Sequence, residues 1–153
     1  MEVVTEKDWP LIMAWRSNPL VYQGFYTQNA PLDWDGHVKW FRSRNQDWRT
    51  FIIHYDDERY HFWRPIGVVT IGQLDHWSPE IGFYIGEVSL WGKGIGREAV
   101  QLALEWLKDY GKKYCHTTIL NTNGRSGQLL QSLGFKDKMV DARDGERWLF
   151  KEL

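Results

Sequence analysis

The segment Trp91-Gly92-Lys93-Gly94-Ile95-Gly96-Arg97 constrains the fold of this chain more than any other, because glycine occupies alternate positions from 92 to 96. It lies between a strand-like run that ends near Ile85 and an amphipathic stretch that begins at Gly96. Glycine permits positive φ angles, and successive N–H groups at a helix N-terminus attract anions. A turn built for geometry alone rarely needs three glycines and a lysine. The segment, called the glycine loop below, therefore predicts a strand-to-helix turn that cradles a pyrophosphate.

The runs on either side of the glycine loop predict an α/β (α+β) domain. Runs rich in β-branched and aromatic residues predict an antiparallel meander of strands at 50–55, 66–71 and 80–85. Apolar residues at helical spacing predict a central helix from Gly96 to Tyr110. The other predicted elements are a strand at 1–5, helices at 9–15 and 34–41, a strand at 115–120, a helix at 125–133 and two strands around the turn Asp144-Gly145. The pattern amounts to about seven strands and about four helices.

Composition and charge narrow the classes of protein to which the chain can belong. Its 153 residues, 42% of them hydrophobic, suffice for one full core and predict a single domain over 1–153. The one cysteine, Cys115, has no partner for an intramolecular disulfide, which favours a reducing, cytoplasmic setting. A formal net charge of -1 with interleaved signs argues against nucleic acid as a partner. We also expect neither a membrane segment nor a signal peptide.

Residues 94–99 also match the dinucleotide fingerprint G-x-G-x-x-G/A, which makes a nicotinamide or flavin enzyme an alternative. The fingerprint calls for an acidic residue about 20 positions later, at the end of the next strand, where this chain has Asn121. The chain that follows is too short for a second mononucleotide-binding half, and the Lys-Ser or Lys-Thr pair of a P-loop is missing. A dinucleotide site is therefore the weaker interpretation.

Metal-assisted and covalent mechanisms find little support in the sequence. The histidines form no H-E-x-x-H or Cys/His cluster, so we expect no metal site. The segment Gly124-Arg125-Ser126-Gly127 misses the G-x-S-x-G spacing of a serine nucleophile. Cys115 lies in a predicted buried strand, where thiols are usually inert. We therefore expect a reaction without a protein nucleophile.

Two segments, one before the glycine loop and one that contains it, resemble the acyl-CoA motif of the GNAT superfamily of N-acyltransferases: Glu80-Ile81-Gly82-Phe83-Tyr84-Ile85-Gly86-Glu87 and Trp91-Gly92-Lys93-Gly94-Ile95-Gly96-Arg97-Glu98-Ala99. Downstream, Asn123, Ser126 and Leu133-Gly134-Phe135 resemble the family's signature around its last helix. The match covers nearly the whole chain.

The amino-terminal part is similar to one branch of that superfamily. Trp15-Arg16-Ser17-Asn18-Pro19, followed by His37-x-x-Trp40-Phe41, resembles the signature of the ribosomal-protein and amino-sugar acetyltransferases, which include enzymes of the pseudaminic acid pathway. The resemblance implies a mixed central sheet, with acyl-CoA in a splay between the fourth and fifth strands. It also implies transfer of an acetyl group from acetyl-CoA directly to a primary amine, without a covalent enzyme intermediate.

The resemblance further implies which residues bind the cofactor. Pantetheine would bond to the backbone near residues 84–86 in the manner of an added strand, and the pyrophosphate would meet the amides of residues 92–97. Asn123 would reach the pantetheine amides, and Lys93 or Arg125 would lie near the phosphates. The implied cofactor-binding residues are Tyr84, Ile85, Gly86, Gly92, Lys93, Gly94, Ile95, Gly96, Arg97, Asn123 and Ser126.

Glu80, at the start of the fourth predicted strand, is the candidate general base, with Asp75 and His76 as rivals. Leu130 stands where many relatives have a tyrosine that protonates the departing thiolate. A thiol of pKa about 8.5 is a tolerable leaving group without an acid, and otherwise the hydroxyl of Tyr84 or Ser132 would act through water. Trp91 replaces the family's usual Arg or Gln, a mild change because the backbone binds the phosphates.

The acceptor amine would enter over the first two helices. Candidate lining residues are Trp15, Tyr22, Tyr26, Trp34, His37 and Trp40. The branch resemblance ranks nucleotide-linked amino sugars level with protein N-termini, and small polyamines below both. A non-catalytic acyl-CoA-binding or regulatory module is the alternative from another functional class, and the chain is expected to be a monomer or a homodimer.

Overall fold

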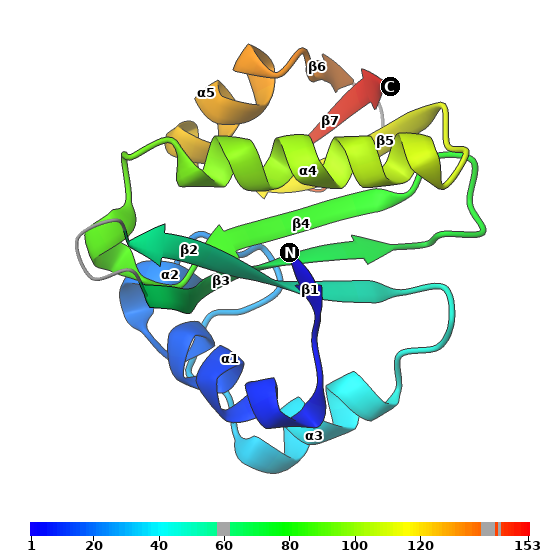
Figure 1. The fold of residues 1–153 in the computed structure, drawn as a ribbon. Coiled ribbons are helices and arrows are strands. Elements are labelled where there is room, and N and C mark those ends of the chain that lie inside the picture. The colour runs from blue at the N-terminus through cyan, green and yellow to red at the C-terminus, as the bar shows by residue number, and fades with distance from the viewer. Residues whose placement is uncertain (58–61, 139–142, 144) are drawn as a thin grey trace.

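The computed structural model describes residues 1–57, 62–138, 143 and 145–153, and within them seven strands form one mixed sheet in the order β1-β2-β3-β4-β5-β7-β6 (Figure 1). The strands are β1 (Glu2–Val3), β2 (Arg49–Asp57), β3 (Phe62–Gly72), β4 (Glu80–Ile85), β5 (Tyr114–Leu120), β6 (Lys136–Lys138) and β7 (Glu146–Glu152). The predicted meander of β2, β3 and β4 is antiparallel, and β4 and β5 are parallel. The prediction of a mixed sheet is confirmed.

Five α-helices occur among the described residues, where the sequence predicted about four. They are α1 (Trp9–Arg16), α2 (Pro19–Tyr22), α3 (Trp34–Arg42), α4 (Ile95–Asp109) and α5 (Gly124–Ser132), with 3₁₀ turns η1 (Glu6–Asp8) and η2 (Val88–Leu90). The prediction missed α2 because it treated Pro19 only as the end of a helix. Pro19 instead begins α2, and the Asn18 side chain caps that helix by accepting a hydrogen bond from the Leu20 N–H at 3.1 Å.

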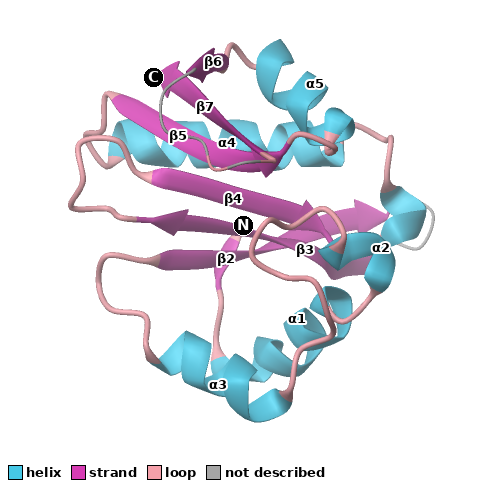
Figure 2. Cartoon of the chain, turned by 180° about the vertical axis from the view of Figure 1, so that it is seen from behind, coloured by secondary structure: helices cyan, strands magenta, loops and turns pink. Residues whose placement is uncertain are grey.

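The helices divide between the two faces of the sheet (Figures 1 and 2). Adjacent residues of a strand point to opposite faces, and the two cores show this directly. Phe51 and Val69 belong to the larger core, which includes the buried side of α4. Their neighbours Ile52 and Val68 belong to a smaller core with Trp15 of α1. Helix α4 therefore covers one face, and α1 packs against the other.

Strands β4 and β5 pair at one point and then separate. The only register pair between them in the described residues is Glu80 with His116, and the His116 N–H donates to the Pro79 carbonyl at 2.9 Å. Past this pair no further register pair joins the two strands among the described residues. The predicted splay between the fourth and fifth strands is therefore present.

The last pair of strands and the start of the central helix lie close to their predicted positions. Strands β6 and β7 are antiparallel, as predicted, but Asp144 of the predicted turn lies outside the described residues. The central helix begins at Ile95, one residue before the predicted start, and Gly94 occupies its N-cap with a φ of 83°. In the part of the chain that the structure describes, no helix combines the length and apolar character needed to cross a bilayer.

We predict that Gly86→Ala lowers the stability of the folded chain. A Cβ at this position would overlap the indole ring of Trp15, which is buried against β4. Overpacking of this kind costs about 1–3 kcal/mol, measurable as a lower midpoint of urea unfolding. Gly124→Ala is the control, because a Cβ there meets no atom within 4 Å. Equal midpoints for the two variants would contradict the tight packing at Gly86.

We predict that the Cys115 thiol does not react in the folded protein. The residue is fully buried in the larger core, and burial raises the pKa of its thiol to about 12. The thiolate is the reactive form, so at pH 8 only a small fraction of an already inaccessible group is nucleophilic. Titration with a thiol reagent should give one reactive group in denaturant and none without it; rapid labelling of the folded protein would refute this.

Candidate active site

One cavity of about 640 Å³ lies at the splay and is lined by residues from both faces of the sheet. Its sheet residues are Thr70, Glu80, Ile81, Gly82, Phe83, Tyr84, Ile85, Thr117, Thr118 and Ile119. From α1, α2, α3 and the segments that follow α2 and α3 come Arg16, Leu20, Val21, Gly24, Phe25, Tyr26, Thr27, Trp40, Arg44 and Trp48. From η2, the glycine loop, α4 and the α5 region come Leu90, Trp91, Gly92, Gly94, Ile95, Gly96, Asn123, Arg125, Ser126 and Leu129. The cavity thus has two compartments that meet at the splay. The first lies beside the glycine loop, α4 and α5, and the second lies beside α1, α2 and α3.

The glycine loop presents unpaired amides to the first compartment. Gly92 and Gly94 have φ angles of 80° and 83°, a left-handed conformation that favours glycine. The five consecutive N–H groups of residues 92–96 donate to no other group in the described residues. They lie at the N-terminus of α4, where the helix dipole adds positive potential. This arrangement has the geometry of an anion cradle.

Two contacts hold the glycine loop in place. The Trp91 indole N–H donates to the Ile85 carbonyl at 2.8 Å, which ties the loop to the end of β4. The Arg125 guanidinium carbon lies 4.9 Å from the centroid of the Trp91 ring, so α5 contributes a cation beside the loop. Lys93 and Arg97 do not line the cavity, although their backbone belongs to the loop. Arg97 instead donates to the Ser132 hydroxyl on α5.

The backbone of β4 offers bonding groups to the gap at alternate residues. The Gly86 N–H donates to the Ile66 carbonyl of β3 at 2.8 Å, so it is already bonded. Hydrogen bonding alternates along an antiparallel pair, so Tyr84 also directs its N–H and C=O toward β3. Phe83 and Ile85 therefore direct theirs toward β5. Of the three predicted backbone contacts at 84–86, only Ile85 faces the gap, and the backbone of Phe83, which was not among the predicted contacts, faces it too.

Asn123 and Ser126 line the cavity and form the N-cap of α5. The Asn123 side-chain oxygen accepts a hydrogen bond from the Ser126 N–H at 3.2 Å, and its amide group donates to the Gly24 carbonyl at 3.2 Å. The second bond ties α5 to the segment that follows α2. The Asn-x-x-Ser pattern thus has a structural role here, because it begins a helix at the cavity wall.

Glu80 faces the second compartment. Phe83 packs against the core under α4 and Tyr84 against the α1 core, so the even-numbered residues of β4 point toward α1. The Tyr26 hydroxyl donates to a Glu80 carboxylate oxygen at 2.9 Å. Burial, and then the charge of Glu80, raise the pKa of Tyr26 above its ordinary value, so the hydroxyl keeps its proton.

The rivals of Glu80 lie elsewhere. Asp75 and His76 are exposed in the turn before β4 and do not line the cavity. The Asp75 N–H donates to an Asp47 carboxylate oxygen at 2.6 Å, and the His76 Nδ1 lies 3.0 Å from the Ser78 carbonyl. Both residues therefore organise the turn, and Glu80 alone of the three candidates faces the cavity.

The three positions considered for a general acid also differ in whether they line the cavity. Leu130 is fully buried in the larger core, so it fills space and presents no polar group. Ser132 lies outside the cavity, where its hydroxyl donates to the Leu129 carbonyl at 2.7 Å. Tyr84 lines the cavity, and its buried hydroxyl has no hydrogen-bond partner among the described residues. Burial raises the pKa of Tyr84 above its ordinary value.

Of the six predicted acceptor-lining residues, Tyr26 and Trp40 line the cavity and the other four do not. Trp15 is buried in the core over Gly86, with its indole N–H donated to Glu87 at 3.1 Å. His37 is also buried, and its Nε2 lies 2.9 Å from the Trp9 carbonyl. Tyr22, on α2, is half-buried outside the cavity.

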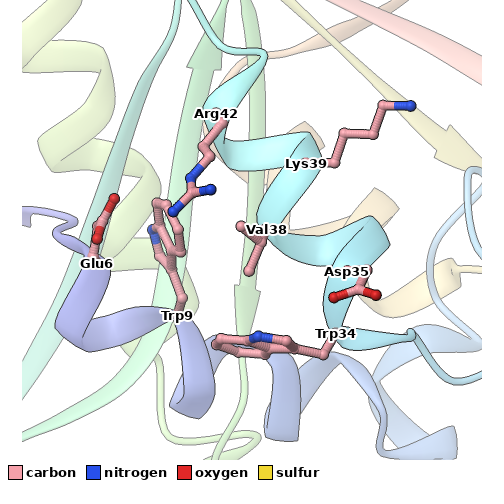
Figure 3. Close-up of a pocket in the computed structure, with 7 residues that line it drawn as sticks. All are labelled: Glu6, Trp9, Trp34, Asp35, Val38, Lys39 and Arg42. Atoms are coloured by element: carbon pink, nitrogen blue, oxygen red, sulfur yellow. The ribbon is translucent and has the colours of Figure 1, made fainter.

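Trp34 lies in a separate, shallow pocket between η1, α1 and α3. Figure 3 shows its indole beside Val38 and Trp9, with Arg42 and Glu6 at the other end of the pocket. None of these residues lines the cavity at the splay. Trp34 therefore does not contribute to the wall that the sequence analysis assigned to it.

Most of the wall around Trp40 was not predicted from the sequence. Arg16, Phe25, Arg44 and Trp48 all line the second compartment. A signal was available, because Trp40, Arg44 and Trp48 are spaced at intervals of four residues. Helix α3 ends at Arg42, however, so helical spacing alone does not place the last two side chains.

Comparison with known proteins agrees with this architecture. Residues 1–136 match the family model described as an acetyltransferase (GNAT) domain. An uncharacterised protein of Methanocaldococcus jannaschii is 45% identical over 150 residues, which are 97% of this chain and 30% of that protein. The chain thus spans less than a third of that relative's length.

Solved structures share the fold. The crystal structure of a domain from Methanocaldococcus jannaschii matches with a TM-score of 0.93 and 43% identity, covering 99% of this chain and 96% of that one. Spermidine N-acetyltransferase from Vibrio cholerae, in complex with CoA and spermine, matches with a TM-score of 0.80 over 99% of this chain and 93% of that one. At 15% identity this second likeness concerns the fold alone. The predicted superfamily is confirmed, because the family model covers most of the chain, and the chain belongs to the GNAT family of acetyltransferases.

Proposed function

We propose that this chain transfers an acetyl group from acetyl-CoA directly to a primary amine, with Glu80 as the general base. The observation that carries the proposal is the single cavity that joins two features across the splay. On one side lie the unpaired amides of the glycine loop, and on the other lies the Glu80 carboxylate. An acyl donor held by these amides and the Glu80 base would meet at the same gap, which is what direct transfer requires.

The cofactor would bind mainly through backbone groups. The pyrophosphate would accept hydrogen bonds from the amides of residues 92–96, with the Arg125 guanidinium beside it. Pantetheine would pair with the backbone of Phe83 and Ile85 as an added strand in the gap that β5 leaves open. The Trp91 indole already bonds the Ile85 carbonyl, so the Ile85 N–H is the group left for the cofactor at that residue.

The reaction would follow from the positions of the polar groups. Glu80 would remove one proton from the ammonium form of the acceptor, directly or through a water, and the amine nitrogen would attack the thioester carbonyl. Collapse of the tetrahedral intermediate would form the amide, release CoA as a thiolate and send the second proton of the nitrogen to water. That thiolate takes a proton from water, because Leu130 offers none.

The acceptor class follows from the branch resemblance and the shape of the cavity. Nucleotide-linked amino sugars and protein N-termini stand level as acceptors, and small polyamines rank below them. The aromatic wall of Phe25, Trp40 and Trp48 suits a ring or a flat group. The buried lone thiol of Cys115 supports a reducing, cytoplasmic setting, and we propose a monomer or a homodimer as the working form.

We predict that Gly96→Asp weakens CoA binding without unfolding the chain. Gly96 lies in the first turn of α4, where a carboxylate favours the helix but repels a pyrophosphate. A new Cβ would make ordinary contacts, 3.4 Å from a Leu129 methyl group and 3.7 Å from the Phe83 ring. Calorimetric titration should give a CoA affinity about tenfold or more below that of Gly96→Ala. Equal affinities in the Asp and Ala variants would show that the pyrophosphate does not bind at the glycine loop.

We predict that Glu80→Gln lowers kcat by about a hundredfold or more at pH 7, because a general base contributes about 10²–10⁴. The deficit should shrink as the pH rises through the pKa of the acceptor amine, about 8 for a protein N-terminus, because the acceptor then loses its proton to solvent. Asp75→Asn is the matched control and should keep its rate. A Glu80→Gln enzyme as active as wild type would exclude this base. Absence of acetylation by wild type, with CoA still bound, would favour the non-catalytic module.

A further inference from the structure

The second compartment holds more hydrogen-bond donors than the described residues satisfy. Arg16 and Arg44 line it, and neither forms an ion pair with a carboxylate in the described part of the chain. The Arg44 Nε and the Tyr84 hydroxyl are buried without a partner among those residues. Arg16 donates from Nε to the Gln28 side chain at 3.1 Å, which leaves its terminal nitrogens for another acceptor. Buried donors in native proteins normally have partners, so this cluster calls for a ligand.

Aromatic rings hold both guanidiniums in place. The Arg44 guanidinium carbon lies 4.0 Å from the centroid of the Trp48 ring and 4.2 Å from that of Trp40. The Arg16 guanidinium carbon lies 5.4 Å from the Phe25 centroid and 5.8 Å from that of Trp40. Stacking covers the faces of a guanidinium and leaves its N–H edges available. The rings thus fix the donors in direction before any ligand arrives.

The electrostatics of the cluster favour a negative charge. Two cations lie over the same indole ring of Trp40 and repel each other. Burial lowers the pKa of both Arg16 and Arg44, and for Arg44 the charge of Arg16 adds to the effect. An anion between them would remove both the repulsion and part of the desolvation penalty.

We propose that Arg16, Arg44 and Tyr84 form a subsite for an anionic group, a carboxylate or a phosphate, carried by the acceptor amine. This inference rests on the proposed function, because Glu80 lines the same cavity and would take the proton from the other end of the acceptor. Guanidinium edges match both oxyanions in bidentate geometry, and a tyrosine hydroxyl adds a third donor. Polyamines are disfavoured, because they would bring further positive charge against two arginines.

The test uses acceptors that differ in one group. A series of para-substituted phenethylamines carries a phosphate ester, a carboxylate, a hydroxyl or a trimethylammonium group, and a second pair is glucosamine with and without a phosphate. Each compound is added at millimolar concentration to the CoA-saturated protein, and the thermal midpoint is recorded; acetyl-CoA turnover is then measured separately. We expect at least one phosphate or carboxylate compound to raise the midpoint, and its kcat/KM to exceed that of its uncharged partner about tenfold to a hundredfold.

Two variants assign the effect to the arginine pair. Arg44→Met keeps an unbranched apolar side chain against Trp40 and Trp48 and should abolish the preference for the anionic compounds. Arg42→Met, on α3 but outside the cavity, should keep it. Removal of the preference by Arg44→Met with unchanged CoA affinity would support the subsite.

Four outcomes would overturn the inference. They are equal shifts with anionic and uncharged partners, the largest shift with the trimethylammonium compound, no shift from any anion, and a loss of CoA affinity in Arg44→Met. Failure of the proposed function looks different. In that case no amine is acetylated, while the Arg44-dependent shift with anionic compounds persists and the subsite stands.

Discussion

The separation of β4 from β5 is the constraint on which the rest of the site depends. A parallel pair normally continues its hydrogen bonds along both strands, but here pairing is confined to Glu80 and His116 in the described residues. The backbone groups of Phe83 and Ile85 then face a gap, because β3 bonds the alternate residues of β4. The chain tolerates this loss because these backbone groups face the cavity, where water or a ligand can bond them. A ligand that supplies a strand-like partner restores the missing bonds.

Unsatisfied donors mark both compartments that meet at this gap. On the α4 side they are the amides of residues 92–96, and on the α1 side they are the guanidinium and phenol groups of Arg16, Arg44 and Tyr84. The chain as a whole carries a formal net charge of -1, so bulk charge gives no hint of these two sites. What distinguishes them is local, because donors are held in place by glycine geometry on one side and by aromatic stacking on the other. Positive potential at both ends of one cavity favours ligands with negative groups at both ends.

The sequence predicted the backbone of the glycine loop well and the wall of the second compartment poorly, and the reason is physical. Glycine spacing before a helix leaves few backbone solutions, so the loop at 92–96 and the helix after it were predictable to within a residue. Aromatic residues have no such specificity, because the same side chain serves a core or a pocket. Trp15 and His37 are buried and Trp40 lines the cavity, although all three belong to the same motif in the sequence. Arg44 and Trp48, which lie beside Trp40, follow the end of α3, where helical periodicity no longer applies.

Because position 130 holds a leucine and provides no general acid, the proposed reaction depends mainly on its general base. Leu130 is sealed in the core beneath α4, so the fold uses that position for packing and provides no acid there. An ammonium nitrogen has no lone pair with which to attack the thioester, so removal of its first proton decides whether the tetrahedral intermediate forms. Glu80 must then stay ionised and correctly oriented. The Tyr26 hydroxyl meets the second requirement with a 2.9 Å hydrogen bond, and its raised pKa keeps the hydroxyl a donor at neutral pH.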